Sequence, residues 1–134
     1  MSAVPNAGPL QRRVLVVDDN EDAADSLAML LSAYGDAVRI AYDGEQAIEL
    51  EAAFVPDVVL LDIGLPKISG YDVARHIRDA RGSSPLIVAI TGWGQQEDRE
   101  RARQAGFDHH FTKPVDLDRL MDVVDRERPR PRNH

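Results

Sequence analysis

VVLLD, at residues 58–62, places four consecutive apolar residues directly before an aspartate. A run this short and continuously apolar is typical of a strand that is covered on both faces of a parallel sheet. Residues 14–17 and 86–90 form runs of the same kind, residues 38–41 form a mixed run, and residues 108–112 are a short, weakly apolar candidate. The sequence therefore predicts five strands.

Segments with helical spacing follow these runs. In four of them apolar residues recur three, four or seven positions apart, which is typical of an amphipathic helix. These four segments are residues 27–34, 47–54, 73–80 and 117–124. Residues 95–105 differ, because they offer only Ala102 and Ala105 as an apolar face, so we expect a lightly packed helix there. Alternating strands and helices predict an α/β fold with right-handed crossovers and a parallel sheet.

The composition limits the classes of protein that fit. A chain of 134 residues without cysteine fits one domain and excludes disulfides, thiolate metal sites and cysteine nucleophiles. The apolar runs are strand-sized and residues 1–13 lack the apolar centre of a signal peptide, so we expect a cytoplasmic protein without a membrane segment. The net charge is −7, and four of the arginines lie in residues 126–134, so direct nucleic-acid binding by the domain is disfavoured.

Both ends of the chain differ in composition from its centre. We expect a flexible N-terminal extension at residues 1–12, a globular domain at residues 13–125, and an Arg- and Pro-rich tail at residues 126–134. A tail with this many arginines can touch nucleic acid or an acidic partner. Its two prolines and its short length favour the end of a linker instead.

Polar side chains end four of the five predicted strands. They are Asp18 with Asp19, then Asp62, Thr91 and Lys113. In an open parallel sheet, ligands bind beyond the carboxyl ends of the strands, so these side chains should converge. Three carboxylates in one cleft repel each other unless a cation lies among them, and oxygen ligands suit Mg²⁺ or Mn²⁺. The added lysine and threonine give a site that suits phosphoryl oxygens.

Four pieces of the sequence together resemble the receiver domain of two-component response regulators. The pieces are VLVVDDNEDAADSL, DVVLLDIGLPKISGYDVA, LIVAITGWG and GFDHHFTKPVD. The resemblance covers residues 13–124 and is specific as a set, because each polar group closes a different strand in the family's order. It implies a single doubly wound (βα)5 domain whose five-stranded parallel sheet has the flavodoxin-like order 2-1-3-4-5.

The resemblance also implies a metal site around the acceptor. Asp62 is expected to be the phosphoacceptor, whose carboxylate attacks phosphorus to give an acyl phosphate. The same carboxylate and Asp19 are expected to bind Mg²⁺ directly, or Mn²⁺ in its place. Asp18 is expected to bind the ion through water, and the backbone carbonyl of Gly64 to be a further ligand.

Four other residues receive expected roles from the resemblance. Lys113 should pair with Asp62 or its phosphoryl group, and Thr91 should follow the phosphoryl group and draw its loop inward. His110 stands three residues before the lysine, where many members carry Tyr or Phe, so the sequence departs from their aromatic switch. Trp93 is expected to contact a partner.

The function implied is that of a phosphoacceptor in a phosphorelay. The phosphoryl donor would be a histidine kinase or a phosphotransfer protein, and an unknown output protein would bind the face formed by the fourth helix, fifth strand and fifth helix. Such a domain is not an enzyme in the usual sense, although it assists its own phosphorylation and dephosphorylation. The receiver module of a hybrid histidine kinase and a pseudo-receiver that is never phosphorylated stay open. An aspartyl phosphatase is disfavoured because Gly64, not a second aspartate, lies two residues after Asp62.

Overall fold

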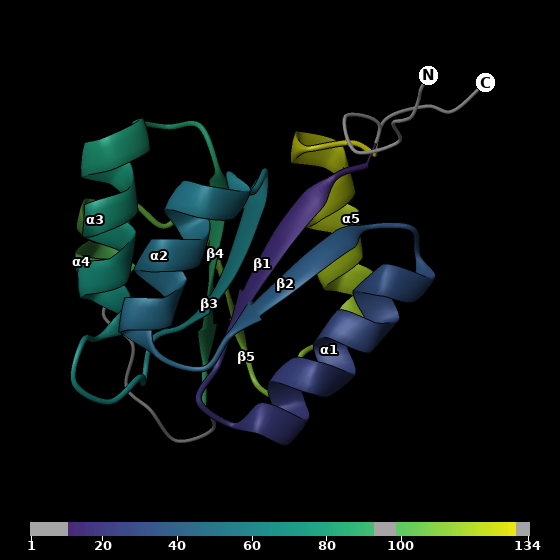
Figure 1. Ribbon diagram of the computed structural model, residues 1–134, viewed down its shortest axis with the longest axis horizontal. Coiled ribbons are helices and arrows are strands. Elements are labelled where there is room, and N and C mark those ends of the chain that lie inside the picture. The colour runs from purple at the N-terminus through teal and green to yellow at the C-terminus, as the bar shows by residue number, and fades with distance from the viewer. Residues whose placement is uncertain (1–10, 93–98, 131–134) are drawn as a thin grey trace.

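Five strands alternate with five helices in the computed structural model, which describes residues 11–92 and 99–130 (Figure 1). The strands are β1 (Arg13–Val17), β2 (Ala37–Ala41), β3 (Val58–Asp62), β4 (Leu86–Thr91) and β5 (His109–Thr112). The helices are α1 (Glu21–Ala33), α2 (Gly44–Phe54), α3 (Gly70–Arg81), α4 (Arg99–Ala105) and α5 (Leu117–Glu127). Each predicted strand and helix is thus present, although residues 95–98 of the predicted fourth helix lie outside the described residues.

The strands form one parallel sheet in the order β2-β1-β3-β4-β5. This confirms the predicted α/β class and the flavodoxin-like order. Helices α2, α3 and α4 cover one face of the sheet, and α1 and α5 cover the other (Figure 1). The carboxyl ends of all five strands therefore meet along one edge.

Side chains of the central strands fill two apolar layers. Leu15, Val59 and Ile87 pack toward α2, α3 and α4, whereas their chain neighbours Val58 and Leu86 pack toward α1 and α5. Because both faces are covered, these strands carry no polar alternation. Burying one such side chain contributes about 1.5–3 kcal/mol. The core thus holds the ends of β1, β3 and β4 in fixed positions.

Helix α4 buries few of its side chains. Within residues 100–105, only Ala102 and Ala105 are buried, as the composition of residues 95–105 predicts. The guanidinium of Arg101 lies 4.2 Å from the centre of the Tyr71 ring on α3. Trp93, which we expected to contact a partner, lies outside the described residues.

Charged residues tie the two ends of the described chain together. The guanidinium of Arg12 donates to Asp36 at 2.9 Å and to Asp125, in the last turn of α5, at 2.6 Å. Arg130 adds a second pairing with Asp36 at 3.0 Å. Residues at both ends therefore contact the domain directly.

Within residues 11–92 and 99–130, no helix has the length and apolar content needed to cross a bilayer.

Candidate functional site

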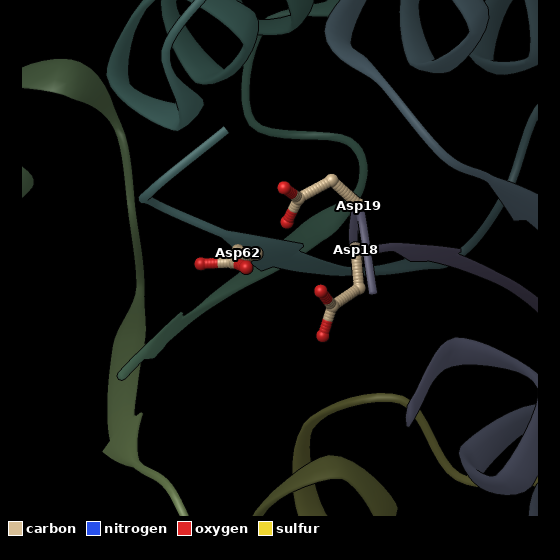
Figure 2. Close-up of side chains that lie close together, drawn as sticks. All are labelled: Asp18, Asp19 and Asp62. Atoms are coloured by element: carbon tan, nitrogen blue, oxygen red, sulfur yellow. The ribbon is translucent and has the colours of Figure 1, made fainter. Parts of the chain in front are cut away.

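Three carboxylates converge where β1 and β3 end. Val17 and Leu61 are partners in the parallel pairing of the two strands, so the residues that follow them are neighbours. Oxygens of Asp18, Asp19 and Asp62 all lie within 4.8 Å of one another, and Figure 2 shows the first two beside the third. Asp18 and Asp62 are buried, whereas Asp19 is exposed. The arrangement offers several oxygen ligands to one cation.

Lys113 reaches this cluster from the far edge of the sheet. Its Nζ lies 2.9 Å from Oδ2 of Asp18 and 3.5 Å from Oδ2 of Asp62. The backbone N–H of Lys113 donates to the carbonyl of Thr91 at 2.8 Å, which fixes the end of β5 beside the end of β4. The lysine therefore bridges two carboxylates and lies closer to Asp18 than to the expected acceptor.

Burial makes the ionised form of Asp62 less favourable than it is for an aspartate in water. Burial raises the pKa of Asp62, and the negative charge of Asp18 adds to the rise. The hydrogen bond from the N–H of Gly64, at 2.9 Å, and the charge of Lys113 lower the pKa but do not cancel the rise. One lysine does not neutralise three carboxylates, so the site retains an excess of negative charge.

Lys113 itself stays protonated. Burial works against its charged form, but the hydrogen bond to Asp18 and the charge of Asp62 outweigh burial and raise its pKa. A permanently charged ammonium at this position is a fixed counter-charge for anionic oxygens.

The loop after Asp62 is held close to the start of α3 by a residue that the sequence analysis did not single out. A Cβ on Gly70 would lie 2.5 Å from the carbonyl oxygen of Asp62 and 2.6 Å from Cα of Ile63. The N–H of Gly70 donates to the carbonyl of Ile63 at 3.1 Å. Glycine therefore lets α3 pack against the backbone of Asp62 and Ile63. In the sequence its only signal was a position near a helix start.

Thr91 and His110 lie in the adjacent strands. Thr91 ends β4 and is 3% exposed. Its hydroxyl lies 3.4 Å from the carbonyl oxygen of Phe111 in β5. His110 is partly buried in β5, in register with Ala89. The structure thus brings Asp18, Asp19, Asp62 and Lys113 together, places Thr91 at the neighbouring strand end, and keeps His110 apart along β5.

An apolar cavity of about 290 Å³ opens beside the cluster, between α1 and the start of α5. Core residues such as Val16 form part of its lining, and Leu27 and Leu30 of α1 form another part. Asp18 and Lys113 also contribute to the lining. A partner that fills this cavity would therefore lie directly beside the bridging lysine.

These features define an α/β protein with a carboxylate cluster and a lysine at the carboxyl edge of its sheet. A sequence model of the response regulator receiver domain matches residues 14–125, so the chain belongs to this family.

Relatives of known sequence and structure agree with this assignment. An uncharacterized 14.6 kDa protein of Leptolyngbya boryana is 31% identical over 115 residues, covering 85% of this chain and 88% of the relative. The transcriptional regulatory protein DltR of Streptococcus agalactiae is 37% identical over 109 residues, covering 81% of this chain but 48% of DltR. The chain thus spans about half the length of this regulator.

Among solved structures, a receiver domain protein (CheY-like) of Methanospirillum hungatei aligns with a TM-score of 0.81 and 25% identity, covering 87% of this chain and 93% of that one. A putative response regulator of Chloroflexus aurantiacus aligns with a TM-score of 0.79 and 27% identity, covering 87% and 96%.

Proposed function

We propose that the protein accepts a phosphoryl group on Asp62 and signals through a partner protein that recognises the phosphorylated form. The observation that carries this proposal is Lys113, whose Nζ bridges Asp18 and Asp62 inside a group of three carboxylates. A nucleophile, a fixed cation and a cation site can suffice for phosphoryl transfer, because the reaction depends mainly on positioning and charge.

The donor set fits a hard divalent cation. The ligand atoms are carboxylate oxygens, and the raised pKa of Asp62 reflects burial and uncompensated negative charge. We assign Asp19, Asp62, Asp18 and the backbone carbonyl of Gly64 to this ion, which would be Mg²⁺ or Mn²⁺. When bound, the ion supplies positive charge that offsets the charge of phosphoryl oxygens.

The protein's own residues have separate tasks in the proposed transfer. A carboxylate oxygen of Asp62 forms a bond to phosphorus as the bond from phosphorus to the donor nitrogen breaks. The N–H of Gly64 holds the orientation of the carboxylate, and Lys113 offsets charge on the phosphoryl oxygens. The hydroxyl of Thr91 would then leave β5 and donate to a phosphoryl oxygen. The domain assists this transfer and the later hydrolysis but does not act on a separate substrate.

The partners we propose are proteins. Receiver domains interact with histidine kinases, so the donor would be a histidine kinase or a phosphotransfer protein. An output protein would bind the face formed by α4, β5 and α5, which includes His110. The acidic net charge of −7 disfavours direct DNA contact by this domain. A receiver module of a hybrid kinase would show the same site chemistry.

Intact mass spectrometry tests the proposal. The original protein, Asp62→Asn and Asp72→Asn are incubated with a small acyl phosphate, with and without Mg²⁺. The proposal expects one added phosphoryl group on the original and on Asp72→Asn, whose carboxylate is exposed on α3, only when Mg²⁺ is present. Asp62→Asn should gain none. Failure of the original to gain mass from the acyl phosphate and from histidine kinases, while a control receiver does, would favour the pseudo-receiver.

A further inference from the structure

Two threonines face each other across the strands that end at the site. Thr91 of β4 and Thr112 of β5 are partners in the parallel register. Their hydroxyl oxygens lie 3.5 Å apart, and the Thr91 hydroxyl lies 3.4 Å from the carbonyl oxygen of Phe111. In this structure the Thr91 hydroxyl is therefore engaged by β5.

The exposure of the two side chains differs. Thr91 is 3% exposed, so its hydroxyl depends on protein partners, whereas Thr112 is exposed. A hydroxyl has one proton to donate and can accept as well. The Thr91 hydroxyl can donate its one proton to the carbonyl oxygen of Phe111 or to Oγ1 of Thr112, and both acceptors lie on β5.

We propose that Thr112 is a positioning residue that holds the Thr91 hydroxyl on β5 and thereby opposes its turn toward a phosphoryl group on Asp62. This inference rests on the proposed function. While the single proton of Thr91 points to β5, it is not available to a phosphoryl oxygen. Thr112 directly precedes Lys113, whose backbone N–H donates to the carbonyl of Thr91, so the backbone keeps the two hydroxyls within reach.

Substitutions at position 112 can separate the effect of the hydroxyl from the effect of the side chain's shape. Thr112→Val keeps the branched shape and removes the hydroxyl, and Thr112→Ser keeps the hydroxyl. Because Thr112 is exposed, neither change leaves a buried void. Removing the Thr112 hydroxyl leaves the Thr91 hydroxyl with one hydrogen-bond partner fewer on β5. Rotation of the Thr91 side chain toward the site then costs less free energy.

Calorimetric titration with beryllofluoride in the presence of Mg²⁺ tests the inference, because this anion mimics a phosphoryl group. The proteins are the original, Thr112→Val, Thr112→Ser, Thr91→Ala and the double variant Thr112→Val with Thr91→Ala. Thr112→Val should bind about twofold to fivefold more tightly than the original, the range expected for one cross-strand threonine pair. Thr112→Ser should bind like the original.

The double variant shows whether Thr112 acts through Thr91. If it does, Thr112→Val has no effect on affinity once Thr91 is alanine. An unchanged affinity for Thr112→Val, or the same gain in the Thr91→Ala background, would overturn the inference while leaving the proposed function intact. Failure of the original protein to bind beryllofluoride and to gain a phosphoryl group would instead remove the proposed function, and the inference with it.

Discussion

Burial of the Asp62 carboxylate lowers the stability of the folded protein at pH values where a free aspartate is ionised. Burial and the charge of Asp18 raise the pKa of Asp62, so the folded state holds the proton more tightly than the unfolded state does. Stability from this group is therefore lost as the pH rises through the raised pKa. Without metal at pH 7, we predict that Asp62→Asn raises the free energy of unfolding by about 0.5–2 kcal/mol.

Urea denaturation of the metal-free proteins checks this prediction. The gain should shrink as the pH falls toward about 4, where an ordinary aspartate also becomes protonated. Asp72→Asn is the control, because Asp72 pairs with Arg75 at the surface of α3 and should show no comparable gain. An equal change in the free energy of unfolding for the two substitutions would mean that burial of the Asp62 carboxylate does not destabilise the folded protein.

Lys113 competes with a metal ion for Asp18. Its Nζ lies 2.9 Å from Oδ2 of Asp18, and its charge repels a cation in the same cluster. We predict that Lys113→Gln binds Mg²⁺ about threefold or more tightly than the original protein, as measured by calorimetry. Lys67→Gln is the matched control, since it removes the chain's other lysine charge. Weaker Mg²⁺ binding by Lys113→Gln would show that the lysine organises the carboxylates instead of competing.

The convergence of the site residues was predictable, but their individual contacts were not. Asp62 and Lys113 end different strands, and parallel strands necessarily end at one edge. The preference of Lys113 for Asp18 depends on a difference of less than 1 Å between two distances, and the contact of Gly70 depends on how α3 packs. Neither leaves a pattern in the local sequence. The expected roles of His110 and of the Gly64 carbonyl stay predictions.

The strands were predictable to the extent that both of their faces are covered. β3 and β4 are buried along their whole length and appear as continuous apolar runs. β5 lies at the edge of the sheet, and its residues are partly buried or exposed, so its apolar signal is weak. The same reasoning applies to β2 at the other edge, where Arg39 is exposed.

Helix α4 should open more readily than its neighbour α3. Within residues 100–105 of α4, only Ala102 and Ala105 are buried, whereas α3 buries five residues, including Tyr71 and Ile77. Few buried apolar contacts correspond to a low free energy of local opening. We predict that hydrogen exchange of the α4 amides is faster than that of the amides in the middle of α3. Equal protection of the two helices would contradict this prediction, and would mean that contacts such as that of Arg101 with the Tyr71 ring make α4 as resistant to local opening as α3.

The charged cluster at the ends of the domain could not be predicted from the sequence. Two of its members, Arg12 and Asp125, are 113 residues apart along the chain, and a composition rich in Arg and Pro is typical of a linker. In the fold, Asp36 accepts hydrogen bonds from both Arg12 and Arg130, and its side chain has no exposed area. Arg12 directly precedes β1, whereas Asp18 and Asp19 follow its other end, so the cluster and the site lie at opposite ends of this strand. Figure 1 shows the last turn of α5 beside the start of β1.

A substitution at Asp36 should therefore weaken the whole fold. Asp36→Asn leaves the buried charge of Arg12 without its main partner, and we predict a loss of about 3–5 kcal/mol in the free energy of unfolding at pH 7, measured by urea denaturation. Arg130→Gln should cost less, because Arg130 is more exposed than Arg12 and Arg12 still pairs with Asp36.

The exposed pair of Asp72 and Arg75 provides the comparison, with an expected loss of about 0–1 kcal/mol for Asp72→Asn. Asp36→Asn protein that remains folded should still bind beryllofluoride with Mg²⁺, since the cluster and the site lie at opposite ends of β1. A loss no larger than that of the surface pair would indicate that Asp36 contributes no more than a solvated contact. The segment from Arg128 to Arg130 would then behave as the linker that its composition predicts.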